Sequence, residues 1–589
     1  MSRLEIGKEK IFIDGKPTKI ISGAMHYFRV FPEYWEDRLI KLKEMGCNCV
    51  ETYIIWNMHE KNEGEFDFSG RLDFVKFIQI ATSLGLYVIV RPGPFICSEF
   101  EFGGLPWWLL KYDDIELRTY NKRYLFFFKR YIEEISKLLK PHMIDNGGNV
   151  IFVQVENEFG SYGDDKLYLT KVKEFFEENG INGPFIACDG ECDYMLKNGM
   201  IPGVYEAVNT HWCEEGVKQL KKYQPDKPGA VMELWTDSDN KWGYKMYHLD
   251  LGEINNRVVQ ALENTELMNF YMYHGGTSFG YMNGTIYDGG KFCYYLTSYD
   301  RDAPINEYGK KTPKYYAVQK TICDYLGKEI VNQSPEPVLT NYGIANLVAS
   351  MPLDKLDKKY YSSCVSKKPL SMEKVNQGYG YITYTKEIEI GANGAVLHVG
   401  NVHDKATIYI DGKYFHWFER DFATRRDIQL SGKHTLTIFV ENLGRINHGT
   451  ELMDYKGIIG DVVLYDKEKD THTVLEDWVI NSYEFDKGIE VIDTHKINGG
   501  LPALYKFEID ITPQTETYLE VKGFERGIVL FNGFNLGRHW NIGPQRSLFV
   551  PKSLLKNGKN EIIIFDVYHT NCQKEVVLHG KQVMDGFED

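Results

Sequence analysis

One stretch shows the pattern that runs through the first half of the chain: Val150-Ile151-Phe152-Val153-Gln154-Val155-Glu156-Asn157-Glu158-Phe159-Gly160. An apolar run leads straight into carboxylates and an amide, as at the end of a buried parallel strand. The complete set of strand-like runs covers residues 19–24, 47–53, 87–91, 150–155, 184–188, 205–209, 229–232 and 268–273. Their spacing leaves room for a helix between most consecutive strands, so the pattern predicts repeated βα units.

The segments between these runs are longer and amphipathic. Helices are predicted over residues 34–45, 71–84, 122–139, 166–178, 251–267 and 313–326. Eight strands with intervening helices in about 300 residues match the size of an α/β (β/α)₈ TIM barrel. The alternative is an open doubly wound sheet, which usually carries a Gly-rich fingerprint after its first strand. Ser22-Gly23-Ala24-Met25-His26 is not such a fingerprint.

The sequence pattern changes at about residue 375, where short runs of alternating apolar and polar residues, separated by turn residues, replace the helical segments. This pattern is typical of antiparallel β-sandwiches, so the barrel is expected to be followed by all-β domains. The runs at 408–412 and 529–533 resemble each other and suggest a distant repeat. We predict a catalytic barrel over 1–328, a linker over 329–375, a first β-sandwich over 376–470 and a second over 471–589.

Composition argues against several classes of protein. The 589 residues carry 68 Lys and Arg against 83 Asp and Glu, a net charge of −15, and no basic run stands out. This argues against a nucleic-acid partner. No run reaches the ~20 apolar residues of a membrane span, and the N-terminus lacks the apolar core of a signal peptide. Ten cysteines are too sparse for a disulfide scaffold. We therefore expect a cytoplasmic protein with reduced thiols and no membrane partner, in which the glycosylation pattern at Asn283 is accidental.

Two carboxylates stand out because they follow predicted strands, where barrel enzymes place reacting groups. Glu158 follows the fourth strand, and Glu233 follows the seventh in Ala230-Val231-Met232-Glu233-Leu234-Trp235. Two such groups can flank a bond held over the barrel mouth, as in a retaining glycosidase, where they lie about 5–5.5 Å apart. The alternative is that both glutamates pair with Arg or Lys in an ion-pair network at the rim. Glu156 is interpreted as structural because strand alternation points it away from Asn157.

Five long motifs carry a resemblance to a known family. They are TYIIWNMHE at 52–60, RPGPFICSEFEFGGLP at 91–106, QVENEFGSY at 154–162, GGTSFGYMNG at 275–284 and NGFNLGRHW at 532–540. In this order and spacing they resemble glycoside hydrolase family 35, the β-galactosidases. The likeness covers nearly the whole chain and implies sandwich domains of jelly-roll or galactose-binding-like type.

The resemblance also implies roles for individual residues. Glu158 matches the family's acid/base, Asn157 its hydrogen bond to the sugar 2-hydroxyl, and Glu233 its nucleophile. The positions that match galactose contacts or line the pocket are Tyr53, Cys97, Ser98, Glu99, Trp235, Tyr281 and Arg301. From the residues alone, Tyr53, Trp235 and Tyr281 could equally be rim packing. His26 and His59 are expected to be hydrogen-bonded supports. We found no His/Asp/Glu cluster with metal-ligand spacing, so neither a metal nor a cofactor is expected.

Two departures from the family pattern fall in the sugar pocket. After Glu233, positions usually held by glycine, tryptophan and aspartate hold Asp237, Ser238 and Asn240, and Arg301 replaces a common tyrosine. One explanation is compensation, with Arg301 paired to Asp237 or Asp239. The other is that Arg301 binds a sugar bearing a carboxylate, sulfate or phosphate.

The sequence therefore predicts a retaining exo-β-galactosidase acting on small oligosaccharides or galactosides. One alternative is a retaining exo-β-hexosidase for another sugar, such as a glucosaminide or galacturonide. Another is a non-catalytic galactoside-binding protein. The sequence is compatible with a homo-oligomer. The likeness of the sandwiches to carbohydrate-binding modules does not itself show that they bind sugar.

Overall fold

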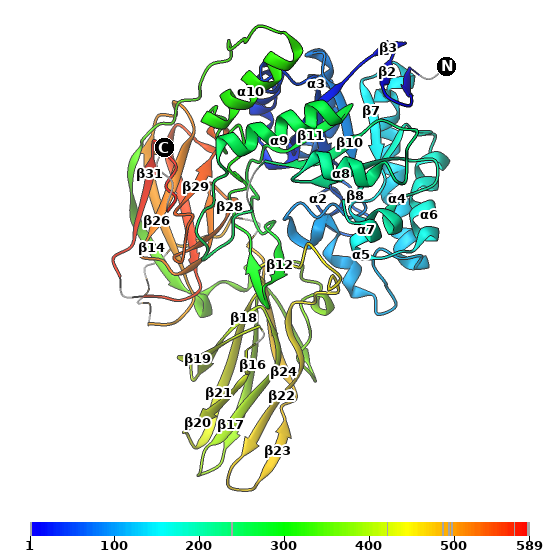
Figure 1. Cartoon of the computed structure of the whole chain (residues 1–589). Helices are drawn as coiled ribbons and strands as arrows, with labels where there is room; N and C mark the ends of the chain where they lie inside the picture. Colours follow the sequence, from blue (N-terminus) through cyan, green and yellow to red (C-terminus); the bar gives the residue numbers. More distant parts are fainter. Residues whose placement is uncertain are drawn as a thin grey trace.

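Eight parallel strands in the first half of the chain close into a barrel (Figure 1). The computed structural model describes residues 3–236, 239–420, 422–485, 488–492, 495, 497, 499–570 and 572–585. The barrel strands are β4 (Ile20–Met25), β5 (Cys49–Tyr53), β6 (Tyr87–Arg91), β7 (Val150–Gln154), β8 (Phe185–Gly190), β9 (Tyr205–Thr210), β10 (Ala230–Trp235) and β11 (Leu267–His274). They pair in sequence order, and β11 pairs with β4 to close the ring. The predicted (β/α)₈ barrel is confirmed.

The barrel strands are buried on both faces, so their sequences are continuous apolar runs. Helices cover the outside. They are α1 (Trp35–Glu44), α2 (Trp56–His59), α3 (Phe74–Ser83), α4 (Lys122–Leu139), α5 (Phe159–Tyr162), α6 (Lys166–Glu178), α7 (Asp193–Gly199), α8 (Cys213–Leu220), α9 (Leu251–Asn264) and α10 (Pro313–Leu326). The helices α4, α6 and α10 have their predicted bounds. The helices α2, α5, α7 and α8 were not predicted, because four to eight residues show too little of a 3.6-residue period.

Helix α4 illustrates how the sequence specifies such a helix. The Asn121 side chain accepts hydrogen bonds from the backbone N–H groups of Arg123 and Tyr124, a cap that contributes about 1 kcal/mol. Its buried side chains recur every three or four residues and form the face that packs on the barrel. They include Tyr124, Phe128, Tyr131, Ile135 and Leu139.

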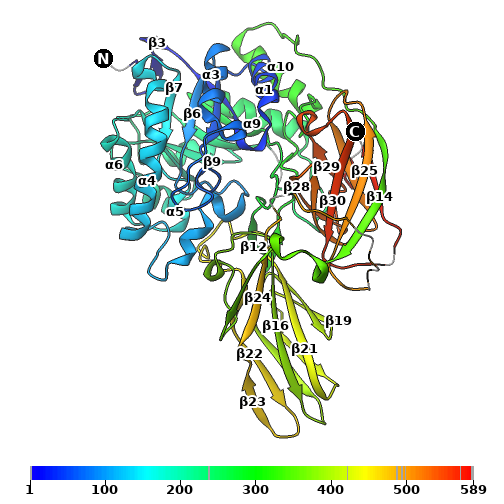
Figure 2. The same cartoon turned by 180° about the vertical axis from the view of Figure 1, so that it is seen from behind.

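The first β domain is a sandwich of two antiparallel sheets (Figure 2). One sheet has the order β15 (Ser362–Ser366), β24 (Trp478–Tyr483), β16 (Tyr381–Ile390), β21 (Gly432–Glu441), β18 (Lys405–Ile410) and β19 (Lys413–Glu419). The other has the order β20 (Arg425–Ile428), β17 (Ala395–His403), β22 (Gly457–Asp466) and β23 (Thr471–Val474). Alternate residues of β17, beginning with Ala395, Leu397 and Val399, are buried between the sheets.

The second β domain contains an eight-stranded sheet. Its order is β28 (Phe534–Trp540), β27 (Arg526–Phe531), β30 (Gly558–Asp566), β25 (Ala503–Ile511), β14 (Gly343–Pro352), β31 (Glu575–His579), β26 (Thr517–Lys522) and β29 (Ser547–Val550). Two smaller sheets lie outside these domains. They are β1 (Leu4–Ile6), β2 (Ile11–Ile13) and β3 (Lys16–Pro17), and the hairpin of β12 (Thr285–Asp288) and β13 (Lys291–Tyr294).

Some strand pairings cross the domain boundaries expected from the sequence. Strand β14 lies in the predicted linker, yet it pairs with β25 and β31 in the last domain, where it is visible as a green strand among orange and red ones (Figure 1). Strands β15 and β24 lie outside the predicted first sandwich, yet they pair with each other within it. These pairings join segments more than 100 residues apart, and local periodicity carries no signal for such contacts.

The two similar runs of the β domains occupy equivalent positions. Each is the turn of an antiparallel hairpin, β18–β19 in one domain and β27–β28 in the other. Both central residues of each turn have positive φ: 52° and 69° at Asp411 and Gly412, and 49° and 83° at Asn532 and Gly533. Asp-Gly and Asn-Gly favour this conformation, so the likeness has a local cause.

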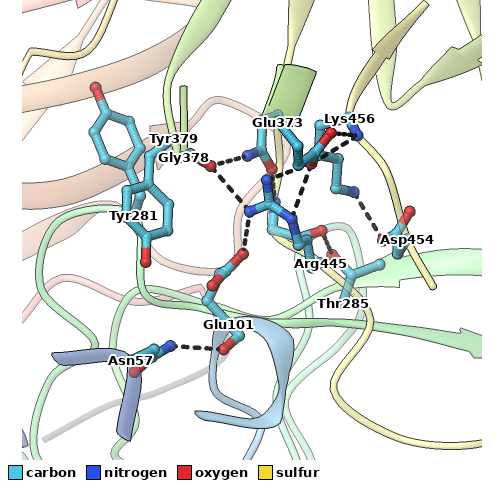
Figure 3. Close-up of polar contacts among 12 residues, drawn as sticks. Asn57, Glu101, Tyr281, Thr285, Glu373, Gly378, Tyr379, Arg445, Asp454 and Lys456 are labelled. Atoms are coloured by element: carbon cyan, nitrogen blue, oxygen red, sulfur yellow. Dashed lines mark hydrogen bonds and ion pairs between the residues drawn. The ribbon is translucent and has the colours of Figure 1, made fainter. Parts of the chain in front are cut away.

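A buried ionic network fastens the first β domain to the barrel (Figure 3). The Arg445 guanidinium donates to Glu101 Oε1 at 2.6 Å, to Glu373 Oε1 at 2.6 Å and to the Gly378 carbonyl oxygen at 2.9 Å. Glu101 belongs to a barrel loop, whereas Arg445 belongs to the β21–β22 loop of the sandwich. Such a network imposes one relative position, because moving either element would leave a charge buried and unpaired.

Among the described residues, we find no helix that is long and apolar enough to cross a membrane. The short 3-10 helices are η1 (Tyr27–Arg29), η2 (Pro32–Tyr34), η3 (Gly70–Leu72), η4 (Glu101–Gly104), η5 (Trp107–Lys111), η6 (Lys140–His142), η7 (Ile144–Asn146), η8 (Leu353–Lys355), η9 (Lys358–Tyr360), η10 (Glu373–Val375) and η11 (Lys552–Leu554). Of these, η4 and η10 carry the two glutamates that Arg445 joins.

Candidate active site

A pocket of about 650 Å³ opens at the carboxyl ends of the barrel strands. Its lining residues are Cys97, Ser98, Glu99, Glu158, His211, Glu233, Trp235, Asp239, Asn240, Lys245, Tyr247, Leu249, Glu253, Arg257, Tyr271, Ile286, Tyr295, Arg301 and His448. The barrel supplies most of them, and His448 comes from the β21–β22 loop of the first β domain. This is the end of the barrel where reacting groups are expected.

Glu233 lies deep in the pocket wall, at an irregularity in strand β10, where the register with β9 shifts. Its carboxylate accepts hydrogen bonds from Arg91 Nη2 at 2.7 Å, Tyr53 Oη at 3.1 Å and Trp235 Nε1 at 3.1 Å. Burial raises the pKa of Glu233, whereas the Arg91 charge opposes that rise and nearby Glu158 adds to it. Three donors converging on one carboxylate favour its ionised form.

Glu158 follows strand β7 and is partly exposed. Its backbone has φ 49° and ψ 37°, a left-handed conformation that non-glycine residues seldom adopt. Asn209 Nδ2 from strand β9 donates to Glu158 Oε1 at 3.0 Å. The two glutamates therefore occupy different environments in one pocket: Glu233 is enclosed by donors, and Glu158 faces the open side.

Asn157 and Tyr53 lie beneath the pocket surface. The Asn157 side chain oxygen accepts from Arg91 Nη2 and from Tyr53 Oη, the latter at 3.4 Å. Both residues are almost fully buried, and neither is among the described residues that line the pocket. They support Arg91 and Glu233 from below in this structure.

Glu51 completes this lower layer. Its Oε1 lies 3.8 Å from Arg91 Nη1, and both side chains are fully buried. Burial raises the pKa of Glu51 to about 7, with the Arg91 charge opposing the rise. Glu233, 2.7 Å from Arg91 Nη2, is therefore the carboxylate that pairs most closely with this arginine.

The turn Cys97-Ser98-Glu99 forms one side of the pocket, and all three residues have positive φ, between 46° and 57°. The Arg29 guanidinium holds this turn by donating to Ser98 Oγ at 2.7 Å and to the Ser98 carbonyl oxygen at 2.6 Å. Strained backbone conformations of this kind persist where surrounding contacts enforce them, and they cluster at functional sites.

Arg301 pairs with Glu99. Its Nη1 lies 2.9 Å from Glu99 Oε2, and Tyr299 Oη also donates to that oxygen. Asp239, one of the partners considered for Arg301, instead lies 2.9 Å from Lys241 Nζ. Asp237 and Ser238 lie outside the described residues. The arginine therefore neutralises a carboxylate in the pocket wall.

Trp235 is among the described residues that line the pocket, and Tyr281 is not. The Tyr281 ring stacks on Tyr379 with 6.1 Å between centroids, and its hydroxyl accepts from the Phe485 N–H at 3.4 Å. Figure 3 shows this tyrosine pair beside the Arg445 network. The structure thus places Tyr281 at the junction between the barrel and the β domains rather than in the pocket, because its loop passes between them.

His26 and His59 form the supporting hydrogen bonds that the sequence predicts, and Glu156 forms a buried ion pair. His26 Nδ1 lies 2.6 Å from Arg29 Nη1, and His59 Nε2 lies 2.5 Å from Tyr27 Oη. Burial lowers the pKa of His59 to about 4, which keeps the ring neutral. Glu156 is buried and paired with Arg118 Nη2 at 2.9 Å. None of these residues is among the described pocket lining.

Sequence reasoning missed several lining residues. Tyr271 falls in a predicted strand, and the sequence alone does not show whether its side chain lines the pocket or packs in the core. His211 follows strand β9 and Arg257 lies on α9, and neither belongs to a motif. His448 comes from another domain, so no barrel pattern could have revealed it.

Comparison with known proteins gives three family matches. The model described as glycosyl hydrolases family 35 matches residues 10–325. The β-galactosidase first all-beta domain matches residues 369–484, and the β-galactosidase galactose-binding domain matches residues 502–560. The second match includes β24 (Trp478–Tyr483) but begins just after β15 (Ser362–Ser366), so it covers all but one of the strands of the observed sandwich.

Relatives match along most of their length. A human protein named beta-galactosidase-1-like protein 2 is 35% identical over 93% of this chain and 87% of its own. A beta-galactosidase of Xanthomonas manihotis is 35% identical over 92% of this chain and 90% of its own. The mouse beta-galactosidase is 32% identical over 97% of this chain and 92% of its own.

Proposed function

Because the chain belongs to glycosyl hydrolase family 35, and so is a glycoside hydrolase, we propose that it is a retaining exo-β-galactosidase. Its substrates would be small oligosaccharides or galactosides with a terminal non-reducing β-D-galactose. The observation that carries the proposal is the pairing of a buried, donor-surrounded Glu233 with a partly exposed Glu158 in one pocket. Two carboxylates in unlike environments are what a double displacement requires.

Glu233 is proposed as the nucleophile. The donors from Arg91, Tyr53 and Trp235 support its ionised form, so an oxygen lone pair is available to attack the anomeric carbon. Glu158 gives its proton to the departing glycosidic oxygen as that bond breaks. Glu158, now ionised, takes a proton from water, whose oxygen displaces Glu233 and releases galactose with β configuration retained.

The pocket wall suits a terminal sugar. Glu99 presents a carboxylate held by Arg301 and Tyr299, which is a fixed acceptor for sugar hydroxyls. Trp235, Tyr271 and Tyr295 add aromatic surface for the sugar's apolar face. These groups favour a single galactosyl unit inside, with the remainder of the substrate toward the open side near Glu158.

The roles can be tested with variants and an added nucleophile. Glu233→Gln should abolish turnover, and Glu158→Gln should lower kcat by ~10²–10⁴-fold, the usual contribution of a positioned acid or base. With azide, the Glu233→Ala variant should form α-galactosyl azide and the Glu158→Ala variant β-galactosyl azide, identified by NMR.

The control is Glu134→Gln, on the exposed side of α4, which should keep full activity. Initial rates on aryl galactoside, glucosaminide, fucoside, glucoside and galacturonide identify the sugar. Preference for another member would overturn the galactosidase assignment while leaving the two glutamates in place. Turnover unaffected by Glu233→Gln would overturn the nucleophile assignment.

We also propose a reducing, cytoplasmic location. All ten cysteines are free, including buried Cys47, Cys49, Cys188 and Cys213. Free thiols in this number are typical of a reducing compartment. Protein taken from cells under acid quench should be alkylated at every cysteine after denaturation, without prior reduction. Recovery of the protein with oxidised cysteines, or in the culture medium, would contradict this proposal.

A further inference from the structure

Three side chains of different chemistry meet on the pocket wall. One ligand atom from each of Cys97, Glu158 and His448 lies within 4.8 Å of the other two. Cys97 follows strand β6, Glu158 follows strand β7, and His448 reaches in from the first β domain. A thiol, an imidazole and a carboxylate are the three side-chain types that bind zinc in proteins.

The distances suit a tetrahedral ion. Cys97 Sγ lies 3.7 Å from His448 Nδ1. Tetrahedral bonds of about 2.0–2.3 Å to zinc hold neighbouring ligand atoms roughly 3.3–3.6 Å apart. The pair therefore needs almost no movement, and a carboxylate oxygen of the partly exposed Glu158 lies within 4.8 Å of both ligand atoms. Because His448 is exposed at the pocket wall, an ion can enter from solvent.

Neighbouring groups orient the three ligands. Asn447 Nδ2 donates to Cys97 Sγ at 3.6 Å, and Asn209 Nδ2 donates to Glu158 Oε1 at 3.0 Å. Hydrogen bonds to ligand atoms of this kind are typical of metal sites. The loop that carries His448 is anchored three residues earlier by the buried Arg445 network, so the imidazole is presented by a fixed segment.

We propose that Cys97, Glu158 and His448 bind one zinc ion, with water in the fourth position, and that this binding reversibly inhibits the enzyme. On binding, the Cys97 thiol releases its proton to the buffer and the thiolate takes the ion. Thiolate and imidazole ligands favour zinc over magnesium or calcium. Inhibition follows because the ion occupies the Glu158 carboxylate, a step that rests on the proposed function; binding itself does not.

The experiment measures binding and activity separately on the full-length protein after treatment with EDTA and desalting. Cobalt(II), which takes zinc sites and gives thiolate charge-transfer absorption, should bind with a stoichiometry of one. Zinc should then displace it, and its affinity is obtained by competition with a chromophoric chelator. Zinc should inhibit turnover over the same concentration range, and EDTA should restore it.

Variants assign the ligands. Cys97→Ser and His448→Gln should each weaken zinc binding by ~10²-fold or more, beyond the 10–100-fold typical for loss of an outer hydrogen bond. The inhibition constant of each variant, relative to its own activity, should rise in parallel. Matched controls are Cys364→Ser and His472→Gln, an exposed cysteine and an exposed histidine remote from the pocket, which should bind zinc like the parent.

Several outcomes would overturn the proposal. They are absence of a cobalt–thiolate band, zinc affinity unchanged in both Cys97→Ser and His448→Gln, or binding at one equivalent that leaves turnover unaffected. A failure of the proposed function is distinguishable. A protein that binds cobalt through Cys97 but hydrolyses no glycoside would keep the metal site and overturn only the assigned activity.

Discussion

Arg445 Nη1 lies 2.6 Å from Glu101 Oε1, with both side chains fully buried at the junction of the barrel and the first β domain. Glu101 stands two residues after Glu99 in the loop that forms one wall of the pocket. Arg445 stands three residues before His448, which lines another part of the wall. This one ion pair therefore ties together two pocket segments that are more than 300 residues apart in the chain.

Removing this arginine should destabilise the domain junction. Arg445→Met leaves Glu101 and Glu373 buried without their cation, and loss of one partner of a buried pair costs about 3–5 kcal/mol. We expect an earlier urea transition for the variant. The matched control is Arg546→Met, whose exposed pair with Asp585 should be worth less than ~1 kcal/mol. Equal midpoints for the two variants would show that the Arg445 network contributes little to stability.

Much of the barrel was predictable because its signals are local. The run 87–91 and the segment 122–139 coincide with β6 and α4, since apolar continuity and a 3.6-residue period reflect burial directly. Glu158 and Glu233 could be selected as candidates because charged residues at the ends of apolar strands are costly without a purpose.

What escaped prediction depends on contacts between distant segments. Nothing near 343–352 shows that β14 pairs with strands beyond residue 500. Tyr281 belongs to a family motif whose resemblance implies a galactose contact, yet its ring packs at a domain junction. From the sequence, Asp237 and Asp239 were the expected partners if Arg301 is paired. In the structure its partner is Glu99, which is much farther away along the chain.

Arg91 is expected to set the acid limb of the pH–rate profile. In the proposed mechanism Glu233 attacks only when ionised, so activity should fall as the pH drops through its pKa. Burial raises that pKa and the Arg91 charge opposes the rise, so Arg91→Met should raise it further. The acid limb of kcat/KM should then move to higher pH by roughly 1–3 units. Arg91→Lys, which keeps the charge, should move it less. An unchanged limb in Arg91→Met would mean that another group controls it.

Arg301 is expected to support galactose binding through Glu99 rather than to select an acidic sugar. Arg301→Tyr removes the cation from Glu99, and loss of a hydrogen bond to a charged group should lower kcat/KM for aryl galactoside by roughly 10–100-fold. The same variant should lower turnover of the galacturonide by a similar factor, leaving the ratio unchanged. A selective loss of galacturonide turnover would instead assign Arg301 to recognition of a carboxylated sugar.

Glu307 should make stability fall as the pH rises. It is buried between the barrel and the last domain, where it accepts from Thr277 Oγ1 at 2.6 Å and Tyr518 Oη at 3.0 Å. Burial raises its pKa to about 8 from an ordinary value of 4.5. Between these values the folded chain holds a proton that the unfolded chain has released.

The sign follows from the proton counts of the two states. Since the folded state binds more protons in this window, the free energy of unfolding decreases as the pH increases from about 4.5 to 8. The proton on Glu307 therefore contributes stability that is fully present below pH 4.5 and is lost as the pH rises toward 8. Glu307→Gln cannot titrate, so its urea midpoint should vary less with pH over this range than that of the parent. Urea midpoints at pH 5, 6, 7 and 8 measure the slope, with Glu134→Gln, a half-buried surface position, as control. Parallel slopes for Glu307→Gln and the parent would show that Glu307 is ionised in both states.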